Sequence, residues 1–445
     1  GARDGVYALD LASNAGAPDG QGLTLFLNGE EIGDEAFPGT GDAGEETAFV
    51  ELTGGTEYQL RVVSDAPGAG ALDYLDVRAV TGDADADIAV QSQDPTYFDD
   101  RLHFSYLDDP TGAASTARDF KSTADVTISN VGTASLNFLD AEITSFAKAG
   151  ATIGDAFQLQ DPSAFDDLTL ATGETATVTV LFDGAEVSGL GNLENGVVSG
   201  VLSLATNDAE DPLVTVDLAG FWQAQDEGGN EPNVNEVWEV FGFSTFVDDV
   251  PFQDSVGGSP LDNQDIYEAV NALEVLSPYW RIADGVDEAR ITQIAAFHSP
   301  GGATVGIHAA GDKGADTTFW SHAGTGNQTL LPLASSGGFA TATFTDGDVP
   351  TSWAGDGVFG IEIANFSTDP TLNPEGPGTV PDGTQRGHFT RAFQALDGDG
   401  NIIENTFLFI QDYTGINYDY NDNMVVVEAI AALGDGQNLA VNGLD

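Results

Sequence analysis

The sequence predicts an all-β protein built from tandem β-sandwich domains. Short alternating or β-branched runs recur along the 445-residue chain and are closed by Gly, Asp or Asn, as in Asp125–Gly132 and Thr175–Phe182. Regular spacing of strands and turns is typical of sandwiches. Hydrophobic residues make up 41% of the chain, and its length allows about two to four domains with separate cores. We expect a middle sandwich, a larger jelly-roll-like C-terminal domain, and one or two short helices.

The first domain is expected over residues 1–82. Residues 83–119 begin with alternating Asp and Ala and contain an Asp-Asp-Pro-Thr-Gly turn, so we expect a linker there with one short strand at Leu102–Tyr106. The strands predicted for the first domain are Gly5–Leu11, Leu23–Leu27, Thr47–Leu52, Tyr58–Ser64 and Leu72–Val80.

Two segments of the first domain, Val50–Val63 and Leu72–Val77, resemble the second half of a malectin-like or family-6-like carbohydrate-binding sandwich. The resemblance implies that this domain could hold glycans. Aromatic rings at Tyr58, Tyr74 and Trp222 would be the platforms on which sugars stack, and packing of these rings into a core is the alternative.

Residues 120–220 form the second expected domain. The motif Val126–Leu136, the strand after Gly173 and Glu174, and the segment Gly200–Asp208 followed by Pro212–Gly220 occur in an order that resembles an Ig-like domain of the ASPM/SPD-2/Hydin type. Domains of this type are also found in bacterial choice-of-anchor D proteins. The resemblance implies a spacer or interaction module rather than an enzyme.

A polar hinge is expected at residues 221–232, before a C-terminal domain at 233–445. Apolar residues at helical spacing predict a helix over Asn233–Phe241, with Pro232 at its start, and a second helix is expected around Asp262–Leu273. The strands predicted after these helices are Ile291–His298, Ala303–Ala309, Thr317–His322, Thr329–Leu333, Ala340–Phe344, Val358–Ile363, His388–Asp397, Thr406–Asp412 and Asn423–Ile430.

The composition excludes several classes of partner. Asp and Glu number 72 against 12 Lys and Arg, which gives a formal charge of −60. Binding to phosphate needs clustered bases, so nucleic acid and anionic membranes are not expected partners. The chain has no Cys and therefore no disulfide or thiolate metal site, and it has no apolar run long enough for a transmembrane segment. The acidity predicts a halophilic protein in a salty or calcium-rich medium.

The first candidate metal loop is Asp397–Asn401. Asp397, Asp399 and Asn401 place oxygen atoms at alternate positions on a turn with two Gly residues, a pattern that suits a hard cation such as Ca²⁺. The positions of Gly and Glu that an EF-hand requires are not matched. A plain hairpin turn is the alternative.

The second candidate loop lies near the C-terminal end of the chain. Its oxygen donors Asp412, Asp419, Asn421 and Asp422 could surround one Ca²⁺ ion and fix the last strand, and a metal-free loop of Asx turns is the alternative. The segment Gln411–Asn423 resembles the terminal domain that follows Ig-like modules in large secreted bacterial proteins, and its Asp-Tyr-Asn-Asp ending is similar to calcium-associated secreted β-domains.

No catalytic motif is evident in the sequence. Four of five His residues fall in the C-terminal domain, but their spacings match no zinc motif, so scattered positions are expected. Carboxylate pairs for glycoside hydrolysis cannot be selected among so many acids. Nucleophile-elbow and phosphate-loop motifs are absent.

These observations favour a non-enzymatic protein at the cell surface, with a structural or adhesive role. It would be the subunit of a filament, sheath or surface layer, with sandwiches stiffened by Ca²⁺. Its expected partners are further copies of itself or neighbouring surface proteins, and glycans in the alternative. That alternative is a carbohydrate-binding protein or an accessory part of a polysaccharide-degrading system. Since the chain opens without an export signal, we expect it to be a mature, processed or partial form.

Overall fold

The structure is a computed structural model of the chain. Of residues 5–79 it describes the backbone of the strands, and side chains are described from residue 86 onward. The described residues are 5–13, 22–27, 30–36, 45–52, 59–64, 72–79, 86–109, 116–146, 155–187, 195–226, 230–247, 268–299, 301–322, 324–351, 357–376, 384, 387–413 and 419–434.

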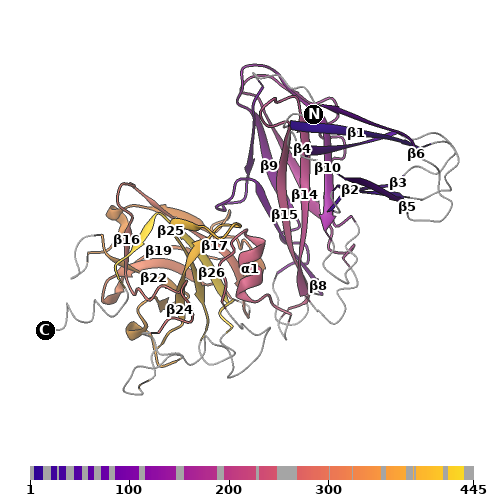
Figure 1. Ribbon diagram of the computed structural model, residues 1–445. Helices are drawn as coiled ribbons and strands as arrows, with labels where there is room; N and C mark the ends of the chain where they lie inside the picture. Colours follow the sequence, from indigo (N-terminus) through magenta and orange to yellow (C-terminus); the bar gives the residue numbers. More distant parts are fainter. Residues whose placement is uncertain are drawn as a thin grey trace.

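Six short strands near the N-terminus are β1 (Gly5–Ser13), β2 (Gly22–Leu27), β3 (Glu30–Ala36), β4 (Glu45–Leu52), β5 (Leu60–Ser64) and β6 (Leu72–Ala79). They form two three-stranded antiparallel sheets, in the orders β4-β1-β6 and β3-β2-β5 (Figure 1). The sequence predicts five of these strands. It does not predict β3, whose residues are mostly acidic or small and are therefore depleted in strands.

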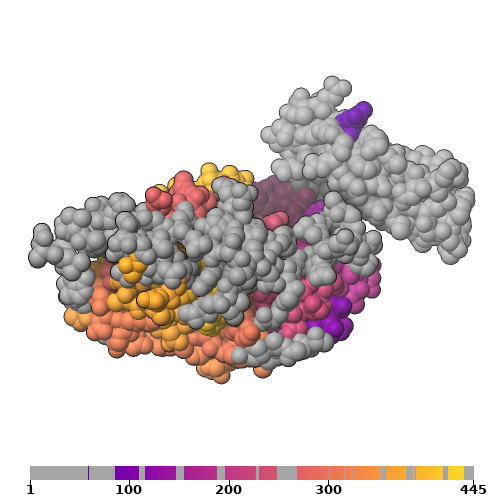
Figure 2. Space-filling view, turned by 90° about the horizontal axis from the view of Figure 1, so that it is seen from below, coloured from indigo at the N-terminus to yellow at the C-terminus, as the bar shows by residue number. Residues whose placement is uncertain are grey.

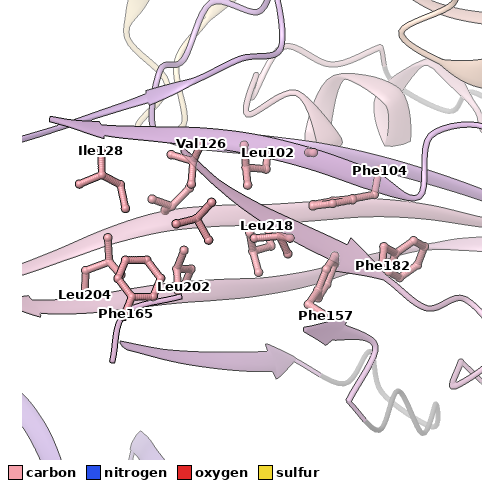
Figure 3. Close-up of a cluster of buried hydrophobic side chains, with 14 of the residues drawn as sticks. Leu102, Phe104, Val126, Ile128, Phe157, Phe165, Phe182, Leu202, Leu204 and Leu218 are labelled. Carbon is pink, nitrogen blue, oxygen red and sulfur yellow. The ribbon is translucent and has the colours of Figure 1, made fainter. Parts of the chain in front are cut away.

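The middle sandwich contains β7 (Ile88–Ser92), β8 (Arg101–Asp109), β9 (Thr123–Asn130), β10 (Leu136–Phe146), β11 (Phe157–Leu159), β12 (Thr169–Leu170), β13 (Thr175–Phe182), β14 (Asn195–Thr206) and β15 (Leu213–Gln225). One sheet has the order β12-β10-β14-β15-β8 and the other β11-β13-β9-β7. Alternate residues of β9 and β13 point inward because successive side chains of a strand face opposite sides. Figure 3 shows Val126, Leu202 and Phe182 in the core between the sheets.

Residues 83–119 differ from the expected linker, because β7 and β8 belong to the sheets of the middle sandwich. The predicted short strand is part of β8, which pairs in parallel with β15, placing Leu102 opposite Leu218. Both faces of β8 are buried: Leu102 and Phe104 face the core of the middle sandwich, and His103 lies against α1 on the other side. Asp108 and Asp109, part of the stretch that suggested a linker, form the end of β8.

The C-terminal sandwich contains β16 (Trp280–Ile282), β17 (Ala289–Phe297), β18 (Thr304–Ala309), β19 (Asp312–Ser321), β20 (Gln328–Leu330), β21 (Thr341–Phe344), β22 (Phe359–Ile363), β23 (Phe366–Ser367), β24 (Thr390–Leu396), β25 (Ile402–Gln411), β26 (Asn423–Glu428), β27 (Ile430–Ala432) and the 3₁₀ turns η1 (Asp346–Asp348) and η2 (Pro370–Leu372). Its two sheets have the orders β19-β18-β22-β16-β27, with β23 beside β22, and β20-β17-β26-β25-β24, with β21 beside β17. Trp280, Ile307 and Phe409 are among the buried residues between them. The prediction of an all-β, sandwich-type fold is confirmed.

The predicted helix is present as α1 (Val234–Val240). The Asn233 side chain accepts a hydrogen bond from the Glu236 amide at 3.0 Å, and the Glu236 carboxylate accepts one from the Asn233 amide at 3.1 Å. This reciprocal capping box satisfies two amides that a helix start leaves without partners. The apolar residues of α1 are buried, as their spacing predicts.

The second predicted helix, around Asp262–Leu273, is not formed in the part of this segment that the structure describes. Residues 268–273 make bends and a turn, and 262–267 lie outside the described residues. The Asn271 side chain accepts hydrogen bonds from the amides of Leu273 at 2.9 Å and Glu274 at 3.2 Å. Such Asx bonds compete with helical hydrogen bonds, so the prediction is wrong for residues 268–273.

Candidate functional site

The first candidate loop, Asp397–Asn401, is the hairpin turn between β24 and β25. One carboxylate oxygen of Asp397 accepts hydrogen bonds from the amides of Asp399 at 3.0 Å and Asn401 at 2.8 Å. The other accepts one from the Asn401 side chain at 3.1 Å. These bonds stabilise the ionised form and lower the pKa of Asp397. Since the carboxylate oxygens already have partners within the turn, the geometry favours the plain hairpin over a cation site.

The second candidate loop is closed by two carboxylates that cross over. The Asp412 carboxylate accepts a hydrogen bond from the Tyr420 amide at 3.0 Å, and the Asp422 carboxylate accepts one from the Tyr413 amide at 2.6 Å. Each end of the loop therefore binds the other, and residues 414–418 between them lie outside the described part of the chain.

Burial and mutual repulsion act on the same two carboxylates. Burial raises the pKa of both Asp412 and Asp422 well above the ordinary value. The Asp419 charge raises the pKa of Asp412 further, and the charges of Asp412 and Asp419 raise that of Asp422. Glu231 adds its charge to the environment of Asp422. No lysine or arginine of the described chain forms an ion pair with Asp412 or Asp422. The second candidate loop, bounded by Asp412 and Asp422 and called the acidic loop below, therefore concentrates negative charge that no base of the described residues compensates.

Tyr420 and Asn421, which belong to the acidic loop, are held by hydrogen bonds to other segments. The Tyr420 ring is fully buried, its hydroxyl donates to the His388 carbonyl at 2.7 Å, and its backbone has a φ of 63°. A positive φ is uncommon for a bulky residue and marks local strain. The Asn421 amide nitrogen donates to the Pro232 carbonyl at 2.7 Å, whereas its buried Oδ1 accepts no hydrogen bond from the described residues. A buried oxygen without a donor is costly and is suited to a cation or water.

The structure brings two of the histidines together. His298 and His322 approach with 2.9 Å between their Nε2 atoms, so the expectation of scattered histidines is wrong for this pair. The other histidines are separate and have other partners. His308 contacts Ser367, and His103 contacts Asp94 at 3.2 Å. No signal in the sequence pairs His298 with His322, because they follow strands of different sheets.

The sequence also does not predict the buried ion pair between Arg391 and Glu274. The Arg391 guanidinium forms two hydrogen bonds to the Glu274 carboxylate, at 2.7 and 2.9 Å, and both side chains are buried. This geometry holds the residue 270–275 segment against β24, where the Val275 amide also donates to the Ala392 carbonyl at 2.8 Å. Burial and the Arg391 charge lower the pKa of His388 to about 3 against the opposing effect of the Glu274 charge, so the ring is neutral. The fully buried setting indicates a structural role.

The middle and C-terminal sandwiches share a hydrophobic core around α1, which lies between them (Figure 1). Phe221 of β15 contacts Phe297 of β17, with ring centroids 5.9 Å apart, and Trp238 of α1 belongs to the same core. His103 of β8 stacks on Phe241 at 4.3 Å. In the space-filling view, the C-terminal sandwich in orange and the middle sandwich in magenta adjoin (Figure 2).

Buried hydrogen bonds accompany this apolar junction. The hydroxyls of Ser105 and Thr329 are 2.7 Å apart. Gln223 donates to Gln328 at 2.9 Å, and Gln328 donates to Glu231 at 2.5 Å. The predicted polar hinge at 221–232 is therefore wrong in its described residues: 221–225 belong to β15, and Gln223 and Glu231 bond to Gln328 of the C-terminal sandwich.

The residues proposed as sugar platforms give no open aromatic surface where they are described. The Trp222 indole donates to the Gly184 carbonyl at 3.1 Å and packs against the core of the middle sandwich. Tyr58 and the side chain of Tyr74 lie outside the described part of the chain.

Within the described residues, no helix is long and apolar enough to cross a membrane. No group of three or more His, Asp or Glu is arranged there to hold a metal ion.

Comparisons with known proteins give no family. No family model matches the chain, and no curated protein matches it. A protein of unknown function from Porphyromonas gingivalis W83 aligns at 13% identity over 49% of this chain and 90% of its own, with a TM-score of 0.22. The secreted serine protease VesC from Vibrio cholerae aligns at 11% identity over 77% of this chain and 50% of its own, with a TM-score of 0.20.

A third similar structure is the periplasmic chaperone SfaE, at 8% identity over 72% of this chain and 96% of its own, with a TM-score of 0.20. TM-scores at this level carry no argument about function. The chemistry and packing of this chain's own residues must therefore support any proposal.

Proposed function

We propose that the chain is an extracellular protein of the cell surface with a structural or adhesive, non-catalytic role, as the subunit of a filament, sheath or surface layer. The observation that carries this proposal is the shared core of the middle and C-terminal sandwiches. This junction buries Phe221 and Trp238 and includes a hydrogen bond from Gln223 to Gln328. Such a junction resists bending between the two sandwiches, as a load-bearing spacer requires. Its partners would be further copies of the chain or neighbouring surface proteins.

The charge of the chain supports the same proposal. A formal charge of −60 keeps folded domains apart in dilute buffer, because like charges repel over the Debye length. Salt or divalent cations would shorten that range and allow acidic subunits to approach each other. Assembly would therefore depend on the ions of the surrounding medium.

We propose Ca²⁺ as the ion of the acidic loop, with Asp412, Asp419, Asn421 and Asp422 as its ligands. The three carboxylates do not form a metal cluster as they lie among the described residues, so binding would have to draw them together. Three features support this assignment: the uncompensated charge of the carboxylates, the unpartnered Asn421 Oδ1, and the oxygen donors that Ca²⁺ prefers. The Asp397–Asn401 turn is left out of the proposal because its carboxylate already binds its own backbone. Bound Ca²⁺ would fix the start of β26, which pairs with β17 and β25 in one sheet.

Electron microscopy of the purified chain tests the structural role. We expect ordered filaments or lattices at high salt with about 1 mM Ca²⁺, a concentration at which extracellular Ca²⁺ modules are occupied. Light scattering should show the same assembly and its reversal by EDTA. A chain that stays monomeric across salt and Ca²⁺ titrations, and binds neither cells nor matrix, would contradict the proposal.

A further inference from the structure

We propose that His298 and His322 form a binding site for a transition-metal ion with a tetragonal geometry, such as Cu²⁺. The two rings come from the ends of β17 and β19, which belong to the two different sheets of the C-terminal sandwich. Their Nε2 atoms are 2.9 Å apart, and the ring centroids are 5.0 Å apart with an interplanar angle of 55°. Both side chains are buried, at 5% and 1% exposure.

The hydrogen bond at the other ring nitrogen of His298 sets its tautomer. Nδ1 lies 2.7 Å from the Ser299 carbonyl oxygen, which can only accept. The proton of the neutral ring therefore resides on Nδ1, and the Nε2 lone pair faces His322. This is the arrangement of metal-binding histidines, whose outer nitrogen usually donates to a carbonyl or carboxylate. Burial lowers the pKa of His298 to about 4, which keeps the ring neutral near pH 7.

The distance between the nitrogens selects the kind of metal. Imidazole nitrogens bind Zn²⁺, Cu²⁺ and Ni²⁺, whereas Ca²⁺ and Mg²⁺ prefer oxygen. With metal–nitrogen bonds of about 2.05 Å, a separation of 2.9 Å gives a nitrogen–metal–nitrogen angle of roughly 90°. That angle fits tetragonal Cu²⁺ or Ni²⁺, and Cu²⁺ binds such ligands most tightly. Two protein ligands leave the remaining positions to water or to an external ligand.

The surrounding loops leave the pair close to the surface. Ser299 and Gly301 after His298 are exposed, as are Gly324 and Thr325 after His322. The two loops lie against each other, since a Cβ added to Gly324 would be 3.7 Å from the backbone of Gly301. The Tyr413 ring packs edge-on against His298, with ring centroids 5.5 Å apart.

Electron paramagnetic resonance of Cu²⁺ added to the full chain in excess Ca²⁺ tests this site. Ca²⁺ occupies exposed carboxylates, and hyperfine coupling distinguishes nitrogen from oxygen ligands. We expect one equivalent of Cu²⁺ with two equatorial nitrogens. His322→Gln keeps a donor for the His298 lone pair but removes the metal ligand, so it should lose the two-nitrogen signal and bind Cu²⁺ at least ~10-fold more weakly.

His308→Gln is the matched control, because His308 is buried elsewhere in the same domain and contacts Ser367. It should retain the two-nitrogen signal. If His322→Gln does not fold, His298→Gln replaces it in the same measurement. An unchanged nitrogen signal in the folded variant, or a wild-type chain that binds no stoichiometric Cu²⁺, would show that the pair is only a hydrogen bond.

Discussion

Asp412 and Asp422 perform two tasks that conflict when no cation is present. Each accepts a backbone amide from the opposite end of the loop, which closes the loop. Negative charge also gathers there: the Asp419 charge raises the pKa of the buried Asp412, and the charges of Asp412 and Asp419 raise the pKa of Asp422. The same residues should therefore destabilise the metal-free protein and stabilise the Ca²⁺-bound protein.

Asp422→Asn tests this conflict. Without Ca²⁺ the substitution removes a repelled charge, while its amide oxygen can still accept from Tyr413, so we expect stability to increase by on the order of 1 kcal/mol. With Ca²⁺ the sign should reverse, because the variant loses a ligand, and ligand binding contributes about 2.7 kcal/mol at 100 times its Kd. Thermal unfolding in EDTA and in Ca²⁺ measures both.

The pH dependence of the metal-free protein gives an independent readout of Asp422. A folded-state pKa raised above the unfolded value means that stability is present at low pH and is lost as pH rises from about 3.8 through the folded pKa. The advantage of Asp422→Asn in EDTA should therefore grow with pH across this range. Asp399→Asn, in the exposed hairpin, is the control and should respond little to Ca²⁺. Equal stabilisation of wild type and Asp422→Asn by Ca²⁺ would refute the assignment.

At the scale of single residues, the sequence locates the acidic loop but not its chemistry. Asp412, Asp419, Asn421 and Asp422 stand out as closely spaced oxygen donors. The burial of Asp412 and Asn421, and the crossed hydrogen bonds of Asp412 and Asp422, arise only when β25 and β26 pair. The His298 contact with His322 depends in the same way on the packing of two sheets, which no local pattern encodes.

At the scale of strands and helices, side-chain alternation is the reliable signal. It predicts β9, β13 and most strands of the C-terminal sandwich, because each has one face on a core. It does not predict β3, which is rich in acidic residues, or β7, a five-residue strand that directly follows the alternating Asp and Ala of residues 83–87. The capping box of α1 is readable from Asn233 and Glu236, whereas the Asx turn at Asn271 replaces a helix that periodicity favours.

The prediction of a polar hinge at residues 221–232 fails because the pairing of elements distant in the sequence decides the fate of polar residues. Gln223 and Glu231 look solvated in the sequence, but Gln328 satisfies both across the junction. A polar segment can therefore be either a linker or one half of a complementary interface. The sequence does not distinguish these because the complementary residues are about 100 positions away.

Phe221→Ala tests whether the junction couples the two sandwiches. Removing a fully buried ring from a shared core should cost about 3–5 kcal/mol. We expect calorimetry of the wild-type chain to show the middle and C-terminal sandwiches unfolding together, and the variant to show two transitions. Phe165→Ala, within the core of the middle sandwich alone, should lower stability without separating them to the same extent. Equal separation in the two variants would argue against a coupling role for Phe221.

At the scale of the whole molecule, charge is the property that the sequence predicts most directly. The acidic side chains outnumber the basic ones six to one, at 72 against 12. Most of the few bases that the structure describes are engaged locally, such as Arg391 with Glu274 and Arg290 with Glu428 at 2.5 Å. Little positive charge remains to offset the long-range repulsion, so the compact state should depend on the ionic strength of the solution.

Raising NaCl from about 0.01 M to about 1 M shortens the Debye length from roughly 30 Å to roughly 3 Å. Since repulsion is greater in the compact chain than in the expanded one, we expect the melting temperature to rise with salt, by about 2–4 °C for each 1 kcal/mol gained in a domain of this size. Measurements in EDTA exclude the acidic loop, and sucrose at equal osmolality controls for solute exclusion. NaCl and KBr should act alike if screening is the cause. A melting temperature that does not change with NaCl would mean that the surface charges are spaced too widely to strain the fold.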